Sequence, residues 1–376
     1  MWPAYVRLIC GLATGERAFA GPFFVTLDLT RRCNLRCSGC RYHPGEAHLP
    51  TQTDPGVSDI SVDLVSRLCS ELRGMDTRRI IMIGEGEPIL HPRFLDLIEI
   101  CKSSGFEIFV ITNGTLIDTS MADRLVELGV DRLQISLWTS DPVDYEIQCG
   151  RPGDRLWSVT VEGMRLLASA KQVRKRQVPK VILHQPLNRL NCRAVEKTTQ
   201  LAMEAGCNGI KFSPFLDHGG MLAHYAIPDE ELPIVIGTLR GLRAQLGGRL
   251  AHNIDEILLR YRYPQVWEAA ACYVAWIDAR VRIDGTVVAC NLCRGVLGDL
   301  KRRSMRDVWN DAPFRSFRKR TRDRASLRAL RNTCSCDFCC HLRANVSVHR
   351  LARWLAIPAG MRRRSPARRG GHAAGE

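Results

Sequence analysis

Short apolar runs alternate with amphipathic segments over residues 23–216. Ser61 is placed to cap the first amphipathic segment, and Gly74 and Gly105 are placed to end the first and the second. The apolar runs predict strands at residues 23–29, 78–84, 106–114, 131–138, 178–187 and 207–216, and helices are expected at residues 61–74, 91–105, 118–129, 156–171 and 192–206. This alternation predicts an α/β fold with parallel strands and right-handed crossovers, and six units favour an open, partial (βα)6 TIM-type barrel.

The pattern changes beyond this region. Residues 272–290 predict two strands around an Asp284-Gly285 hairpin, and residues 304–320 predict a helix, which together make a small α+β module. We therefore expect an N-terminal extension, a barrel core, linking helices, the α+β module and a basic tail that is partly disordered. In this order, the five parts cover residues 1–22, 23–228, 229–271, 272–345 and 346–376.

Polar motifs follow the expected strands of the barrel. Residues 33–40 (CNLRCSGC) follow the first strand, and residues 84–88 (GEGEP) follow the second. Asn113 lies at the end of the third strand, and Ser136 lies at the end of the fourth. Because the carboxyl ends of parallel strands meet at one rim of such a barrel, we expect these motifs to share a site.

Cysteine is abundant, with 16 residues in 376. The chain has no uninterrupted apolar stretch of the roughly 18 residues that a membrane span needs, and its N-terminus lacks a signal-peptide pattern. We therefore expect a cytoplasmic protein, in which reduced thiols bind metals more often than they form disulfides. The cysteines gather in two regions, residues 33–40 and residues 272–340.

The first cluster has the spacing CX3CX2C. Cys33, Cys37 and Cys40 can hold three corners of a cubane [4Fe–4S] cluster and leave its fourth iron open. An open metal position is typical of a catalytic site. A zinc knuckle with a distant fourth ligand such as His43 is the structural alternative.

Together with the GEGEP loop, this cysteine motif resembles the radical S-adenosylmethionine (SAM) enzymes over residues 23–216. The resemblance implies that SAM chelates the open iron and is cleaved by one electron to a 5′-deoxyadenosyl radical, which abstracts a hydrogen atom from the substrate. Glu87 and nearby carbonyls would accept from the SAM ammonium, and Ser136 and Arg151 would hold its carboxylate. The implied cofactor-binding residues are Gly84, Glu85, Gly86, Glu87, Asn113, Ser136 and Arg151.

Two positions depart from the family pattern. Glu85 stands where the usual GGEP loop has a glycine, which bears on the loop geometry. The residue before the third cysteine, usually bulky and placed over the adenine, is Gly39. We therefore expect Tyr42 or another side chain to take over the adenine contact.

The C-terminal cysteines follow the order C(X12)GX4C, hairpin, helix and CX2C. This order resembles the auxiliary-cluster module of SPASM and twitch radical SAM enzymes, and the compact series CSCDFCCH favours the twitch form with one auxiliary [4Fe–4S] cluster. A zinc ribbon built from two CX2C pairs is the alternative. The expected ligands are Cys272, Cys290, Cys336 and Cys339, with Cys293, Cys334 and Cys340 in reserve.

Charge is concentrated near the C-terminus. Residues 301–376 hold 20 Lys and Arg against 5 Asp and Glu, whereas the first 300 residues hold 34 of each. Such basic segments usually form a solvated surface. The alternatives are that this segment lies on an anionic membrane surface or holds a phosphorylated substrate. We expect no nucleic acid partner.

The resemblance implies an enzyme that needs a reducing partner such as flavodoxin or ferredoxin. A small-molecule substrate, oxidised or epimerised at carbon, is favoured slightly, because only 32 residues precede Cys33, too few for a fused peptide-recognition domain. A maturase of a ribosomal peptide and a non-catalytic iron–sulfur scaffold are the alternatives. Oxidation through the auxiliary cluster is preferred, and for an epimerisation the candidate catalytic hydrogen donors are Cys149 and Cys192, which follow the fourth and fifth strands.

Overall fold

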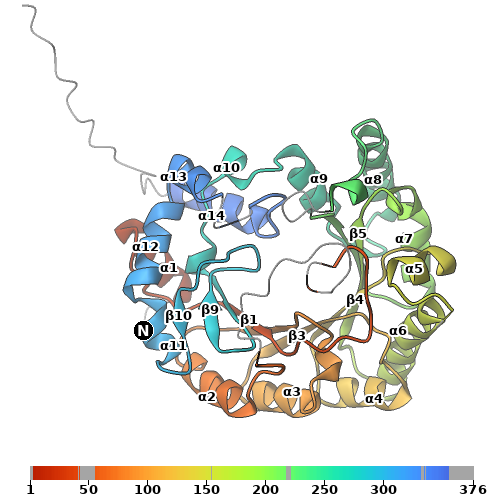
Figure 1. Ribbon diagram of the computed structural model, residues 1–376, viewed down its shortest axis with the longest axis horizontal. Helices are drawn as coiled ribbons and strands as arrows, with labels where there is room; N and C mark the ends of the chain where they lie inside the picture. Colours follow the sequence, from red (N-terminus) through yellow and green to blue (C-terminus); the bar gives the residue numbers. More distant parts are fainter. Residues whose placement is uncertain are drawn as a thin grey trace, which may run out of the picture.

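A single curved sheet forms most of a barrel in the computed structural model, which describes residues 3–40, 42, 56–153, 155–216, 222–331, 334 and 336–354. Ten strands in this part of the chain follow the order β10-β9-β8-β1-β2-β3-β4-β5-β6-β7 (Figure 1). The six that form the barrel core pair in parallel with their neighbours, which confirms the partial (βα)6 barrel. They are β1 (Phe24–Asp28), β2 (Arg79–Ile83), β3 (Glu107–Thr112), β4 (Arg132–Ser136), β5 (Lys180–Leu187) and β6 (Gly209–Pro214).

Helices cover the outer face of these strands (Figure 1). The side chain of Ser61 accepts from the Leu64 amide at the first of them, as expected of a cap. Gly105, with φ of 87°, lies just beyond the second helix and lets the chain turn into β3. The helices between the strands are α2 (Val62–Leu72), α3 (Phe94–Ser103), α4 (Thr119–Glu127), α6 (Leu156–Val173) and α7 (Val195–Glu204).

Alternate residues of each strand face opposite sides of the sheet. In β4, Leu133 and Ile135 are fully buried in the apolar layer between the sheet and the helices. Gln134 and Ser136 therefore face the inside of the barrel, where β5 and β6 also present polar side chains. The apolar face stabilises the fold, and the polar inner face is available for chemistry.

The C-terminal module extends the barrel sheet instead of forming a sheet of its own. Strand β8 (Asp278–Val281) pairs in parallel with β1, and the expected hairpin continues into β9 (Thr286–Val288), which is antiparallel to β8. Gly285, with φ of 80°, forms the turn. A short β10 (Gly298–Asp299) and, at the opposite edge of the sheet, β7 (Ala251–His252) complete it.

The expected helix at residues 304–320 is two helices, α11 (Met305–Trp309) and α12 (Ala312–Thr321). Pro313 lies in the first turn of α12, where its missing N–H costs nothing, but it would break a continuous helix. The side chain of Asn310, between the two helices, bonds both the amide and the carbonyl of Ala18. The break thereby joins the module to the N-terminal segment.

Further helices surround the sheet (Figure 1). Helices α9, α10 and α14 lie between the two edges of the curved sheet, and α14 forms part of the segment expected to be a basic tail. No helix in the described ranges is long and apolar enough to cross a membrane. The additional helices are α1 (Ala4–Thr14), α5 (Pro142–Gln148), α8 (Leu232–Leu246), α9 (Ile254–Arg262), α10 (Val266–Ala269), α13 (Arg324–Ala329) and α14 (Leu342–Trp354).

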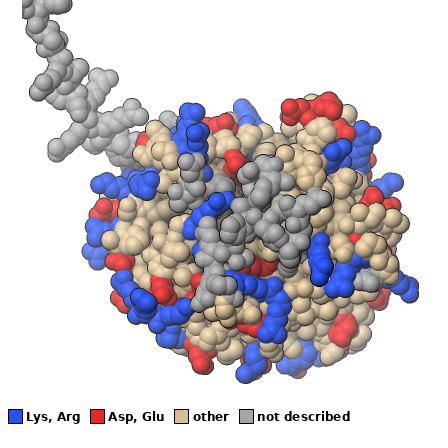
Figure 2. Space-filling view, in the orientation of Figure 1, with Lys and Arg blue, Asp and Glu red and all other residues tan. Residues whose placement is uncertain are grey.

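Charges of both signs alternate around the rim of the face shown in Figure 2. Exposed ion pairs such as Arg315–Glu16 and Arg303–Asp311 tie basic residues of the C-terminal region to acidic neighbours. Much of the described part of this basic segment is thus a solvated surface. Residues 355–376, which carry part of the basic tail, lie outside the described residues.

Candidate active site

The three-cysteine loop follows β1 and packs on the end of α5, a helix that the sequence analysis did not identify. The Arg36 amide donates to the Cys149 carbonyl at 3.0 Å, and the Ser38 amide donates to the Gln148 carbonyl at 2.8 Å. Gly150, with φ of 68°, lies so close to the Arg36 carbonyl that a Cβ would clash with it. The loop is thus held by backbone contacts that leave its thiols for other partners.

The thiols of this loop interact with one another. Burial raises the pKa of Cys33 to about 11, and Glu87 and Cys40 contribute to the shift. The pKa of Cys37 is also raised, first by its contact with Cys149 and by burial, then by Cys40 and Cys33. Three soft sulfur donors in one loop fit an iron–sulfur cluster, and because thiolates are the ligands, binding must release protons. Within the described residues, no three Cys, His, Asp or Glu side chains are arranged to hold a single metal ion.

The GEGEP loop lies directly against the chain that enters the cysteine loop. The Gly86 amide donates to the Thr30 carbonyl at 2.9 Å, and the Glu87 amide donates to the Arg32 carbonyl at 2.7 Å. A Cβ on Gly84 would fall 2.7 Å from the Thr30 carbonyl oxygen, and one on Gly86 would collide with the backbone around Arg32. Both glycines are therefore required by close backbone approach.

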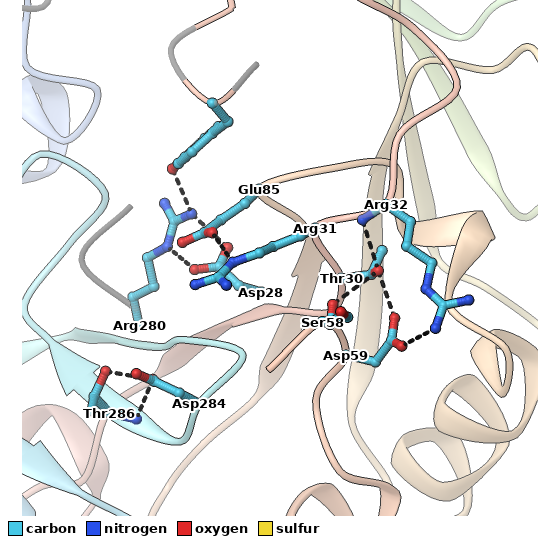
Figure 3. Close-up of polar contacts among 11 residues, drawn as sticks. Asp28, Thr30, Arg31, Arg32, Ser58, Asp59, Glu85, Arg280, Asp284 and Thr286 are labelled. Atoms are coloured by element: carbon cyan, nitrogen blue, oxygen red, sulfur yellow. Dashed lines mark hydrogen bonds and ion pairs between the residues drawn. The ribbon is translucent and has the colours of Figure 1, made fainter. Parts of the chain in front are cut away.

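Glu85, the departure from the usual glycine, points away from this backbone contact. Its carboxylate accepts from Arg31 Nε at 3.1 Å, and the two side chains face each other in Figure 3. On the other side of the same chain, Asp59 accepts from Thr30 at 2.7 Å and from Arg32 at 2.7 Å. The Glu85 side chain thus forms an ion pair beside the loop.

The Glu87 carboxylate is buried at the centre of the rim. It accepts from the Thr112 hydroxyl at 2.6 Å, from the Asn113 amide at 2.7 Å and from the Ile89 amide at 3.2 Å. Burial raises its pKa to about 7, although the same hydrogen bonds act to lower it. Since an ionised carboxylate has about four acceptor positions, little capacity remains, and the SAM ammonium would be bound mainly by loop carbonyls.

The remaining sequence-predicted cofactor residues lie at the same rim. The Asn113 side chain donates to Asn34 of the cysteine loop at 2.9 Å, and Arg151 Nε donates to the Asn34 carbonyl at 3.1 Å. Arg151 is exposed at this position. Ser136 ends β4 and faces the inside of the barrel beside His184 of β5. The structure therefore brings Asn113 and Arg151 to the cysteine loop, and it places Ser136 on the adjoining inner face.

The space beside Gly39 is filled by aromatic rings that the sequence analysis did not identify. A Cβ at residue 39 would lie 2.6 Å from the Trp138 ring and 2.8 Å from the Phe215 ring. Trp138 follows β4, Phe215 follows β6, and their ring centroids are 6.4 Å apart, edge to face. The missing bulk in the cysteine loop is thus supplied from two other rim segments.

Tyr42, the side chain expected over the adenine, contacts the C-terminal module. Its hydroxyl lies 3.2 Å from Arg280 Nη2 of β8, and Arg280 forms a buried, two-bond ion pair with Asp28 of β1 at 2.7 and 2.5 Å (Figure 3). Burial alone would lower the pKa of Arg280, but Asp28, Tyr42 and Cys290 outweigh it and raise that pKa. Arg280 therefore lies between the cysteine loop and the auxiliary cysteines.

The four expected auxiliary ligands come together from distant positions. The pKa of Cys336 is raised by its contact with Cys334, by burial, and then by Cys272, Cys339 and Cys290. Burial is the largest cause that raises the pKa of Cys339, and Cys272 and Cys290 contribute to it. The four thiols therefore influence one another within the module, and their assignment as ligands of one iron–sulfur cluster stays a prediction.

The three reserve cysteines lie close to the four expected ligands of the auxiliary cluster. Cys293 Sγ is 3.7 Å from Cys290 Sγ, and Cys293 forms an isolated backbone bridge with Cys334. Hydrogen bonds from Cys293 and Cys336 lower the pKa of Cys334 to about 4. Cys340 lies 3.4 Å from the Asn291 side chain. The fold thus gathers more thiols than one cluster needs.

The two candidate hydrogen donors are both buried and engaged. The Cys149 thiol lies against Cys37, behind the cysteine loop. The Cys192 thiol donates to Glu231 at 3.3 Å, and burial raises the pKa of that thiol to about 11. Neither placement exposes the sulfur to the barrel interior, and both favour a structural role.

Comparison with known families agrees with this geometry. The model of the radical SAM superfamily matches residues 27–182, and the model of the iron–sulfur cluster-binding domain named SPASM matches residues 272–341. The chain belongs to the radical SAM superfamily and carries a C-terminal SPASM-type module. Its cofactors are therefore SAM, the [4Fe–4S] cluster that binds SAM, and auxiliary iron–sulfur chemistry in the module.

Similar proteins have the same overall organisation. The chain is 23% identical over 314 residues to the tungsten-containing aldehyde ferredoxin oxidoreductase cofactor-modifying protein of Pyrococcus furiosus, covering 78% of this chain and 83% of that protein. It is 24% identical over 317 residues to the PqqA peptide cyclase of Ruegeria pomeroyi, covering 81% and 78%. The solved structure of anSMEcpe with bound AdoMet has a TM-score of 0.61 at 15% identity, covering 89% and 98%, which shows the shared fold.

Proposed function

We propose that this radical SAM enzyme modifies a peptide by abstraction of a hydrogen atom, with the auxiliary site as electron acceptor. The observation that carries the proposal is the path from Tyr42, just beyond Cys40, through Arg280 to Cys290. The pairing of β8 with β1 makes the strand before the cysteine loop and the first strand of the module neighbours in one sheet. A substrate held beside these strands is within reach of both cysteine clusters.

Bound SAM and its cluster would supply a 5′-deoxyadenosyl radical at this rim, and the auxiliary cluster would accept an electron. The residues of the chain orient and shield these groups. Asn113 and Arg151 brace the cysteine loop, and the Trp138 ring closes the side that Gly39 leaves open. The buried Asp28–Arg280 pair fixes the distance between the loop and the module.

The preference for a peptide rests on the relatives. The match to the PqqA peptide cyclase covers 81% of this chain, and the name of that protein states a peptide substrate. The PqqA peptide cyclase gives no support to the preference for a small molecule from the sequence. That preference depended on the length of the segment before Cys33, and in this segment α1 packs against Val274–Trp276 of the C-terminal module.

The test is anaerobic turnover with reconstituted protein, dithionite and SAM. Short peptides encoded beside the gene are compared with a panel of sugars and secondary alcohols. We expect peptides to stimulate 5′-deoxyadenosine formation and to lose hydrogen, as measured by mass spectrometry. The variant with all three loop cysteines replaced by alanine is the control and should form neither product. Stimulation by the small molecules alone would contradict the proposal.

A further inference from the structure

A row of polar side chains crosses the inner face of β4, β5 and β6. Ser136 is the register partner of His184, and His184 is the register partner of Lys211. Ser213, two residues beyond Lys211, extends the row on the same face. This row starts at Ser136, a residue of the expected SAM site, and ends on β6.

Lys211 has no carboxylate partner among the residues that the structure describes. Its ammonium donates to Gln134 Oε1 at 3.2 Å, and no Asp or Glu of the described ranges lies within ion-pair distance of it. Burial lowers the pKa of Lys211, while Glu256 and Cys340 act at longer range to raise it and Arg260 to lower it. The side chain is only partly covered, so a ligand inside the barrel can reach it.

The groups around Lys211 do not compensate its charge. His184 Nε2 is 2.9 Å from the Ser213 hydroxyl, and burial keeps the pKa of His184 well below its usual value, so the ring is neutral. Arg260, a second cation nearby, donates to the Phe338 carbonyl at 2.9 and 2.5 Å and forms no ion pair with a described carboxylate. Partly buried cations of this kind are favourable only when an anion joins them.

We propose that Lys211, with Gln134 and His184 beside it, binds a carboxylate group inside the barrel. Two sources share this chemistry. One is an acidic side chain or C-terminus of the substrate, and this source rests on the proposed peptide function. The other is the methionyl carboxylate of SAM, since Ser136 is two strands away on the same face.

A different role for the charge would be to balance the auxiliary cluster. Arg260 contacts the backbone next to Cys339, and Cys340 influences Lys211. Lys211 itself, however, donates to Gln134 of β4, and it has no hydrogen bond to a described residue of the module. The carboxylate site is therefore the better account, and the two roles predict different measurements.

The experiment uses the anaerobically reconstituted holoenzyme and three variants. Lys211→Met removes the charge at similar length, and Lys211→Arg keeps it. Lys180→Met is the matched control, because Lys180 is an exposed lysine at the opposite end of the neighbouring strand β5. Calorimetry measures binding of SAM and of two probes, N-acetylglutamate methylamide and N-acetylglutamine methylamide. A redox titration followed by electron paramagnetic resonance measures the auxiliary-cluster potential.

Lys211→Met should weaken binding of a carboxylate ligand by roughly tenfold to a hundredfold, the loss expected for one charged hydrogen bond. Lys211→Arg should restore most of it, and Lys180→Met should match the wild type. Loss confined to SAM identifies its carboxylate as the ligand, and loss confined to the glutamate probe identifies the substrate. If Lys211→Met binds SAM and the glutamate probe as tightly as the wild type does, the proposal is overturned, whether or not the potential of the auxiliary cluster shifts.

The same data separate this site from the proposed function. Weaker carboxylate binding in Lys211→Met, with no peptide turned over by the wild type, would keep the site and remove the peptide function. Turnover of a peptide with the same KM in wild type and Lys211→Met, together with unchanged SAM affinity, would keep the function and remove the site.

Discussion

Replacement of Gly86 by alanine tests whether the GEGEP loop positions the cysteine loop. A Cβ at residue 86 would lie 2.6 Å from the Arg31 carbonyl oxygen and closer still to that of Arg32. Carbon approaches a carbonyl oxygen to about 3.3 Å in ordinary contacts, so the two backbones must separate by roughly 1 Å. Cys33 follows Arg32 directly, and the separation would therefore displace a thiol of the cluster site.

The expected cost comes from the hydrogen bonds that this separation breaks. The amides of Gly86 and Glu87 donate to carbonyls of the facing chain at 2.9 and 2.7 Å. Each such bond contributes about 1 kcal/mol, so Gly86→Ala should destabilise the protein by about 2 kcal/mol. The urea midpoint measures this loss, while iron per chain after reconstitution and calorimetric SAM affinity measure the damage to the site. Both should fall.

The adjacent variant Glu85→Ala is the matched control. It removes the ion pair with Arg31 without forcing the two backbones apart, so it should cost less than about 1 kcal/mol and lower SAM affinity less than Gly86→Ala does. If Gly86→Ala kept the wild-type urea midpoint and SAM affinity, the loop would not depend on close backbone approach. An equal loss of stability and of SAM affinity in Gly86→Ala and Glu85→Ala would also refute this dependence.

Three further predictions concern the loop, the module and the adenine side. Replacing all three loop cysteines by alanine should remove about four irons per chain and abolish SAM cleavage, measured by iron assay and 5′-deoxyadenosine formation. Arg280→Met leaves the buried Asp28 carboxylate unpaired and should cost about 3–5 kcal/mol in urea unfolding, whereas the double variant with Asp28→Leu should recover most of it. Gly39→Phe should weaken SAM binding because Trp138 occupies the space, and adding Trp138→Ala should restore it, measured by calorimetry. An unaffected Gly39→Phe protein would show that the ring moves freely.

Local patterns determined the barrel and the first cluster site. Apolar strands of six residues or so and capped helices are properties of neighbouring residues, so the six βα units and the cap at Ser61 could be predicted. The spacing of Cys33, Cys37 and Cys40 is likewise local, because one loop after β1 holds all three. The hairpin at Gly285 could also be predicted, because its turn depends on neighbouring residues.

Contacts between distant residues were decided only by the tertiary structure. The pairing of β8 with β1 joins residues about 250 positions apart, and no periodicity encodes it. The tertiary structure also decided how side chains at the rim are oriented. Cys192 was expected to face the catalytic rim, but its thiol donates to Glu231. Trp138 fills the space at Gly39, and Lys211 meets no carboxylate of the described residues, because packing and charge balance depend on which segments meet in space.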